Sequence, residues 1–155
     1  MTHKMVNIAL YQPDIPQNTA AIVRLGACFK LNIHIIGPCA FNLEDKRFKR
    51  VAMDYANFTK IYKYKDYNNF KMKNSKSRFI LITTKAKKYY HNFKFMDKDM
   101  LIFGKESAGV PKNIHAEIKD KLKIPMQSNT RSLNIAISVA VVISEALRQN
   151  NFNSL

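Results

Sequence analysis

Residues 124–149, IPMQSNTRSLNIAISVAVVISEALRQ, decide how the rest of the chain is interpreted. A short apolar pair leads into the polar segment MQSNTRS, and residues 133–147 then form a long apolar segment. Its length and its alanine and leucine content predict a helix rather than a strand, with Ser132 in the N-cap position. Apolar positions cover roughly 260° of this helix, more than a small domain can bury. We therefore expect a binding site at the polar start of the helix and a dimer interface along its body.

The composition predicts a single domain, residues 1–155, because the chain is long enough for one core and too short for two. A hydrophobic content of 46% excludes a disordered chain. No apolar run reaches the roughly 18 residues of a membrane span, and the first residues lack a signal-peptide pattern. A cytoplasmic location without a membrane partner is therefore expected. Cys28 and Cys39 are expected to be plain, buried or half-buried thiols, with no metal site.

The charge favours a phosphate polyanion as partner, because 26 Lys and Arg residues stand against 11 acids and give a net charge of +15. The alternative is compositional drift towards lysine as an ordinary surface residue. Within residues 60–94, eleven Lys or Arg residues accompany a single acid, Asp66, and aromatic residues are interleaved with them. This mixture suits RNA phosphates and stacked, unpaired bases, although it also fits a solvated surface whose aromatic residues point into the core.

Apolar runs alternate with helical patterns along the chain, which predicts an α/β fold with one mostly parallel sheet flanked by helices. The predicted strands are residues 5–10, 32–37, 58–64, 78–84, 100–104 and 123–125. The predicted helices are residues 18–31, 42–53, 111–121 and 133–147.

Three polar loops follow predicted strands, at residues 82–84, 104–109 and 125–132. Ligands of open α/β sheets bind at the carboxyl ends of the strands, so these loops form the candidate site. Gly104 and Gly109 permit a close approach of the backbone to a ligand. The sequence contains no GxGxxG after the first strand, no GxxxxGK[ST], no HExxH and no Cys/His cluster. The usual dinucleotide, triphosphate, zinc and serine-hydrolase sites are therefore excluded.

Three motifs in order resemble those of the SPOUT RNA methyltransferases of the TrmH-like branch. They are IPQNTAAIVRL at 15–25, LIFGKESAGVP at 101–111 and IPMQSNTRSLNIA at 124–136. The resemblance covers residues 6–148 and matches the smallest members, which lack an added RNA-binding domain. The stretch DKRFKRVAMDY at 45–55 is similar to the tRNA 2′-O-methyltransferases that modify wobble nucleotide 34.

The resemblance implies a SPOUT fold with a deep carboxyl-terminal trefoil knot, a homodimer, S-adenosylmethionine as methyl donor without a metal, and the anticodon stem-loop of tRNA as substrate. It implies S-adenosylhomocysteine as the product of the cofactor. The catalytic residues that it implies are Asn18, Arg24, Glu106, Ser132 and Asn134. The cofactor contacts that it implies are Ile82, Thr83, Gly104, Ile124, Met126, Ser132 and Leu133.

Arg24 is often assigned as the base in this family, but a guanidinium stays protonated at neutral pH and is a poor base. We favour Arg24 as a phosphate clamp that stabilises developing alkoxide charge, supplied by one subunit to the cofactor of the other. The 2′-hydroxyl proton would then pass to a phosphate oxygen or to water.

Simpler interpretations of the same residues stay open. Asn18 and Ser132 would serve as helix caps, and Arg24 and Glu106 as solvated surface residues. The sequence departs from the wobble-enzyme pattern at Ala20-Ala21, at Ala108 and at Ala136-Ile137, where Gly-Asn, a basic residue and Ser-Asn are usual. Two other functions also stay open: 2′-O-methylation of another tRNA position or of ribosomal RNA, and RNA binding without catalysis.

Overall fold

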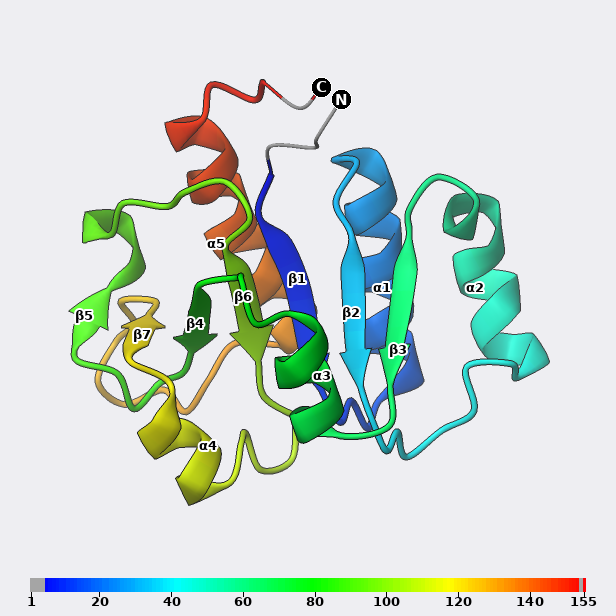
Figure 1. The fold of residues 1–155 in the computed structure, drawn as a ribbon, viewed down its shortest axis with the longest axis horizontal. Helices are drawn as coiled ribbons and strands as arrows, with labels where there is room; N and C mark the ends of the chain where they lie inside the picture. Colours follow the sequence, from blue (N-terminus) through cyan, green and yellow to red (C-terminus); the bar gives the residue numbers. More distant parts are fainter. Residues whose placement is uncertain (1–4, 154) are drawn as a thin grey trace.

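The apolar runs of the sequence form a seven-stranded sheet in the computed structural model, which describes residues 5–153 and 155 (Figure 1). The strands are β1 Asn7–Tyr11, β2 Ile33–Ile36, β3 Ile61–Tyr64, β4 Phe79–Ile82, β5 Lys88–Tyr89, β6 Met100–Phe103 and β7 Asp120–Lys123. Their order across the sheet is β3-β2-β1-β6-β4-β7-β5, and the pairings of these described strands are all parallel. The predicted parallel α/β architecture is confirmed.

Parallel pairing places the carboxyl ends of all these strands at one edge of the sheet. β1 is central, with Ile8 opposite Ile33 of β2 and Leu101 of β6. The chain proceeds outward from β1 through β2 to β3, and then crosses to β4 on the far side of β6. Such a reversal is where open α/β sheets bind ligands, so the loops after β4, β6 and β7 are well placed for a site.

Helices cover both faces of the sheet (Figure 1). They are α1 Pro16–Cys28, α2 Lys46–Ala56, α3 Tyr67–Lys73, α4 Lys112–Glu117 and α5 Ile135–Gln149, with a short 3-10 helix at Tyr90–Asn92. One core joins α1 and α5 to the sheet through residues such as Ile22 and Val139. A second core joins α3 and α4 to the opposite face through Phe70 and Ile114. α2 packs on α1 through Phe48 and does not reach the sheet centre.

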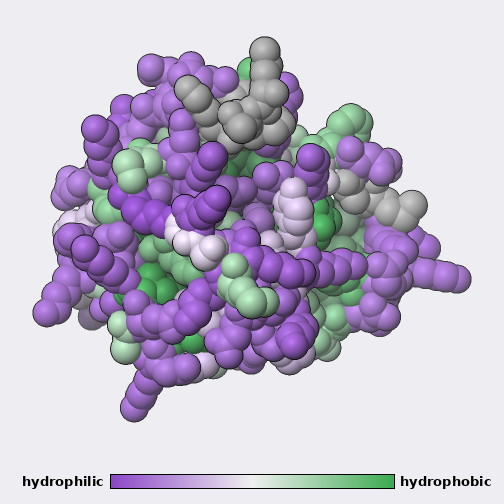
Figure 2. Space-filling model, in the orientation of Figure 1, coloured by the Kyte–Doolittle hydropathy of each residue, from purple (hydrophilic) through white to green (hydrophobic). Residues whose placement is uncertain are grey.

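The body of α5 is buried on one side only, as predicted. Val139, Val142 and Ile143 are fully buried against the sheet, whereas the side chain of Ile137 is 53% exposed. The sheet face that carries α3 and α4 is covered mostly by hydrophilic residues (Figure 2). α5 packs with α1 on the other face of the sheet, so its exposed apolar side belongs to the α1–α5 layer (Figure 1). The dimer interface expected there stays a prediction.

Several predicted boundaries were wrong, most of them where short elements follow one another. α1 begins at Pro16 rather than at residue 18, and α4 ends at Glu117 rather than at 121 because β7 already begins at Asp120. The last strand was predicted at residues 123–125, but it ends at Lys123, the first residue of that range. α3 was not predicted, although Asp66 caps it by accepting a hydrogen bond from the Asn69 N–H at 2.8 Å.

The N-cap of α5 was also predicted wrongly. The side chain of Asn134, not Ser132, accepts hydrogen bonds from the N–H groups of Ala136 and Ile137, at 2.8 and 3.4 Å. Cys39 is half-buried as expected, but Cys28 is exposed. Across residues 5–153 and 155, no helix has the length and apolar character needed to cross a membrane, and no cluster of three metal-ligating side chains occurs.

Candidate active site

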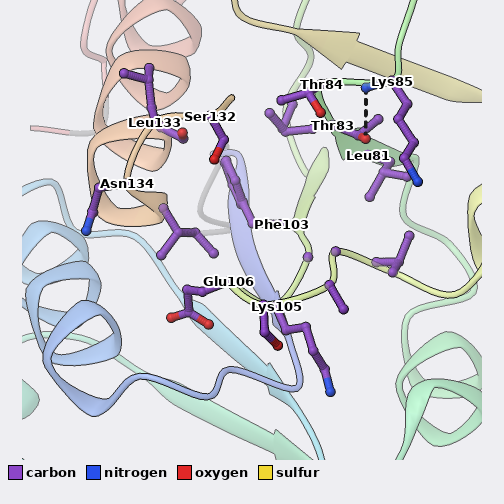
Figure 3. Close-up of a pocket in the computed structure, with 18 of the residues that line it drawn as sticks. Leu81, Thr83, Thr84, Lys85, Phe103, Lys105, Glu106, Ser132, Leu133 and Asn134 are labelled. Atoms are coloured by element: carbon purple, nitrogen blue, oxygen red, sulfur yellow. Dashed lines mark hydrogen bonds between the residues drawn. The ribbon is translucent and has the colours of Figure 1, made fainter. Parts of the chain in front are cut away.

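A cavity of about 510 Å³ opens at the carboxyl ends of β4, β6 and β7, beside the start of α5 (Figure 3). Its walls come from the three loops that the sequence singled out, together with Ile15 and Asn18 near the start of α1. All the residues predicted to contact the cofactor line it, namely Ile82, Thr83, Gly104, Ile124, Met126, Ser132 and Leu133. Their location at one cavity is therefore established, while their contact with a cofactor stays a prediction.

The loop after β6 turns back on itself so tightly that it needs two glycines. Lys105 and Gly109 exchange backbone hydrogen bonds, with N···O distances of 3.2 and 2.8 Å. Gly109 has a φ of +66°, in the left-handed region that glycine tolerates best. A Cβ atom added to Gly104 would lie 2.5 Å from the Cα of Gly109. The loop thus presents its main chain to the cavity, and any side chain at position 104 would displace it.

Glu106 connects the three motifs through hydrogen bonds. Its carboxylate accepts from the backbone N–H of Asp14 at 3.1 Å and from the Asn18 amide at 3.4 Å. The Asn18 oxygen accepts in turn from the Asn134 amide at 2.9 Å. Since Asn134 also caps α5, one chain of contacts fixes the start of α1, the loop after β6 and the start of the last helix. Neither Asn18 nor Ser132 is a helix cap, which removes the simpler interpretation of both.

The carboxyl groups of Glu106 and Asp14 are neighbours in this network, and their pKa values shift in opposite directions. Burial and the adjacent Asp14 side chain raise the pKa of Glu106. Hydrogen bonding with Glu106 and Ser107 lowers the pKa of Asp14. A proton entering the pair therefore resides on Glu106. Asp14 and Ser107, which hydrogen-bond to each other, were not predicted as site residues. Their only sequence signal is their position beside the motif residues Asn18 and Glu106.

The wall opposite Ser132 is built by the loop after β4, in which Thr83 has a structural part (Figure 3). The Thr83 N–H continues the β4–β7 pairing by donating to the Leu122 carbonyl at 2.9 Å. Its hydroxyl oxygen accepts from the Lys85 N–H at 3.3 Å and closes the turn. Lys85 and Lys105 also line the cavity, and the sequence reasoning did not select either of them. They supply positive charge close to the polar loops.

Arg24 is the one predicted catalytic residue that lies away from the cavity. Asn18, Glu106, Ser132 and Asn134 line the cavity, whereas Arg24 is exposed farther along α1. Six helical residues correspond to a rotation of about 240° and a rise of about 9 Å, so Asn18 and Arg24 point in different directions. The Arg24 guanidinium carbon lies 4.9 Å from the ring centroid of Tyr55 on α2. Within one subunit the chain brings four of the five residues together.

Comparisons with known proteins agree with this geometry. Residues 5–144 match the model of the SpoU rRNA methylase family. A tRNA (cytidine(34)-2′-O)-methyltransferase of Beijerinckia indica is 40% identical over 144 residues, covering 92% of this chain and 90% of that relative. A structure solved in a study of 2′-OH methylation of C/U34 on tRNA superposes with a TM-score of 0.91, at 32% identity, over 96% of this chain and 97% of that one.

One further structure shows the same fold at a greater distance. The SpoU methyltransferase AviRb of Streptomyces viridochromogenes, in complex with the cofactor AdoMet, has a TM-score of 0.88 at 17% identity. The match covers 97% of this chain and 60% of that chain. At this identity the likeness concerns the fold alone.

Proposed function

The chain belongs to the SpoU rRNA methylase family, and from this membership we propose that it transfers a methyl group from S-adenosylmethionine to the 2′-oxygen of nucleotide 34 in tRNA. The observation that carries the proposal is the meeting of Asn18, Glu106, Ser132 and Asn134 at one cavity, from three segments far apart in the chain. Relatives that match nearly the whole chain are tRNA (cytidine(34)-2′-O)-methyltransferases, which supports the wobble position. A role in tRNA modification supports the expected cytoplasmic location.

The cavity fits S-adenosylmethionine in size and in chemistry. Its volume of about 510 Å³ lies within the usual range for cofactor sites. The close approach of Gly104 to Gly109 leaves main chain at the cavity wall, which suits a planar base held by backbone groups. Ile82, Ile124 and Leu133 supply apolar surface beside it. When bound, the cofactor supplies an electrophilic methyl group on a sulfonium.

The protein's own residues must then hold the ribose oxygen near the methyl carbon, exclude water and accommodate the proton that leaves. Positioning at about 3 Å accounts for a large part of such catalysis. Glu106 and Asn18 fix the cavity wall through their hydrogen bonds. Arg24 binds a substrate phosphate and stabilises the negative charge that develops on the 2′-oxygen, since a guanidinium does not serve as a base at neutral pH. The proton passes to a phosphate oxygen or to water.

A homodimer would complete this site. Arg24 lies outside the cavity of its own subunit. Ile137 on α5 and Leu133, which precedes the helix, leave apolar surface exposed, at 53% and 38%. Packing of the α1–α5 layers of two subunits would cover that surface and bring Arg24 of each towards the cavity of the other. The Ala136-Ile137 pair, where the related pattern has Ser-Asn, makes this contact more apolar.

The deep trefoil knot of the SPOUT class is part of the same proposal. Its support is family membership and the close packing of α5 against the segment between β5 and β6. The Gln149 side chain donates to the Phe93 carbonyl and accepts from the Phe95 N–H, each at 2.9 Å. These contacts hold the last helix beside the loop through which a knotted chain would pass.

The decisive experiment is transfer of labelled methyl from S-adenosylmethionine to unfractionated tRNA, followed by mapping of the modified nucleotide. We expect label at the 2′-oxygen of nucleotide 34, lost in Arg24→Ala and retained in Lys76→Ala, a control that removes an exposed cation beyond α3. Full activity of Arg24→Ala would reject the role given to Arg24.

Two other outcomes correspond to the remaining functions. The matched family model is described for ribosomal RNA methylases, so label on ribosomal RNA or on another tRNA position would keep the chemistry and change the substrate. Salt-sensitive RNA binding without any methyl transfer, indifferent to the cofactor, would indicate a non-catalytic binding protein.

A further inference from the structure

A groove of about 480 Å³ lies between the carboxyl-terminal ends of α1 and α2, and the proposed reaction does not use it. Cys28, Lys30, Tyr55, Phe58 and Lys60 line it. β2 and β3 begin beside these helix ends, so the groove lies at the edge of the sheet opposite the cofactor cavity of the same subunit (Figure 1). We call it the α1–α2 groove.

Phe58 presents its ring to solvent from a well-fixed turn at the end of α2. Its side chain is 71% exposed, and its N–H donates to the Tyr55 carbonyl at 2.9 Å. The next residue, Thr59, donates its hydroxyl to the Leu31 carbonyl and ties the turn to the start of β2. The exposure of Phe58 therefore results from a backbone that is fastened on both sides. A rigid, exposed aromatic ring is the usual platform on which an unpaired base stacks.

The charge around this ring is positive. Lys30 follows the end of α1 with a φ of +53°, at a position where helices usually have glycine. Lys60 lies across the groove, and neither lysine makes an ion pair with a described residue. The described residues that line the groove include no carboxylate. The two lysines therefore leave the groove with a positive charge that no described lining residue neutralises.

Tyr55 connects the groove to Arg24. One side of its ring faces the Arg24 guanidinium, 4.9 Å from the centroid, and Tyr55 also lines the groove. Arg24 is the residue assigned to a substrate phosphate at the cavity of the other subunit. An RNA strand that reaches Arg24 would therefore pass beside Phe58, Lys30 and Lys60 of the same subunit.

We propose that the α1–α2 groove binds an unpaired nucleobase of the RNA substrate, next to the nucleotide that enters the partner subunit's cavity. The base stacks on Phe58, and Lys30 and Lys60 contact the adjoining phosphates. This inference rests on the proposed function for its substrate, and it assigns to the groove a part of the anticodon-loop recognition that the cofactor cavity does not supply.

The test compares three variants of the full chain for binding of unfractionated tRNA at fixed salt. Phe58→Ser removes the stacking ring and is expected to weaken binding roughly tenfold. Lys30→Gly removes the cation while suiting a φ of +53°, so the fold is kept and the slope of log affinity against log salt falls by about 1. Met72→Ser, which removes a 70% exposed apolar side chain from α3, is the matched control and should change neither quantity.

The oligomeric state and cofactor affinity of each variant complete the experiment. Unchanged mass by light scattering, unchanged S-adenosylmethionine binding and weaker tRNA binding in both groove variants would support the proposal. Dissociation of a dimer by Phe58→Ser would show that a second copy of the chain covers the groove, and would overturn it. Equal tRNA affinity in Phe58→Ser and wild type would also overturn it.

The same measurements separate this proposal from the proposed function, because binding is read without methyl transfer. If wild type methylates nucleotide 34 and Phe58→Ser does so with unchanged affinity and rate, the groove proposal fails alone. If wild type transfers no methyl to tRNA but the groove variants still lose affinity, the proposed activity fails and the groove remains an RNA site.

Discussion

The cofactor cavity and the surface around Arg24 differ in how far one chain completes them. In the cavity, Glu106, Asn18 and Asn134 hold one another through hydrogen bonds. Around Arg24, the side chains of Arg24 and Phe58 are exposed, and the contact of the guanidinium among the described residues is the ring of Tyr55. The cavity is organised before any ligand arrives, whereas the second surface is the one that we propose to meet a second subunit and RNA. The predictions below test this difference, from the largest expected effect to the smallest.

The largest effect is expected from Arg24→Ala. Loss of one group that stabilises transition-state charge typically lowers kcat by about 100-fold to 1000-fold. S-adenosylmethionine affinity, measured by calorimetry, should stay at the wild-type value because Arg24 lies outside the cavity. Weaker cofactor binding in this variant would contradict the separation of Arg24 from the cofactor cavity.

Co-expression of Arg24→Ala with Glu106→Ala extends this test to the dimer. Unlike Glu106→Gln, the alanine variant removes both hydrogen bonds, to the Asp14 N–H and to the Asn18 amide, and we expect it to lose activity. A composite site leaves each mixed dimer with one intact site, so about a quarter of all sites should regain activity. If each subunit uses its own Arg24, the mixture should stay as inactive as the two parent variants.

A second effect concerns the sheet that supports both regions. His34 on β2 is buried, with its Nδ1 2.8 Å from the Tyr64 hydroxyl, and burial lowers its pKa from 6.5 to about 4. The unfolded chain therefore binds this proton first as pH falls, and stability decreases between about pH 6.5 and pH 4. The loss by pH 4 corresponds to about 3 kcal/mol.

Urea unfolding at several pH values checks the effect of His34. The difference between wild type and His34→Gln isolates it from the carboxyl groups that titrate in the same range. Parallel stability curves for the two proteins would contradict the prediction. Above pH 6.5 both regions should keep their support, and activity can be compared without unfolding.

A third effect tests how tightly the cavity is preformed. Gly104→Ala would place a Cβ atom 2.5 Å from the Gly109 Cα, so the loop must shift. Overpacking of this kind costs about 1 to 3 kcal/mol, and we expect S-adenosylmethionine binding to weaken at least tenfold. Ser75→Ala, an equally small change at an exposed turn outside the cavity, is the control. Normal binding in Gly104→Ala would mean that the loop is not a fixed wall.

The smallest effect is a change of pH dependence in Glu106→Gln. Because the pKa of Glu106 is raised, wild type should lose activity on acidification at a higher pH than an ordinary glutamate would cause. This group favours folding in its protonated form, a contribution that is present at low pH and lost as pH rises through its pKa, so titration of Glu106 itself does not destabilise the fold on acidification. Comparison in the His34→Gln background removes the destabilisation that His34 causes in the same pH range. The glutamine variant should be a few-fold less active at neutral pH and lack this acid limb. An unchanged pH–rate profile would remove Glu106 from the network that controls activity.

The sequence predicted the central elements and the cavity walls well, because both have local signatures. Uninterrupted apolar runs marked the buried strands, and the loops after β4, β6 and β7 do line one cavity, as expected for a site at that edge. The sequence did not predict α3. Its seven residues lie among lysines and bury only a few side chains, such as Phe70. Short elements contain too few apolar positions to reveal a period, and tertiary contacts then decide their form.

What the sequence determined by itself was the α/β class, the family, and the set of residues at the carboxyl ends of the strands. What only the tertiary structure decided was which of these residues meet. Asn18 and Asn134 are 116 positions apart, and their hydrogen bond depends on how α1 and α5 pack. The same packing turns Arg24 away from the cavity and makes Asp14 a neighbour of Glu106. A sequence pattern reports local burial and conformation, whereas the direction of a side chain and its distant partners follow from the assembled sheet.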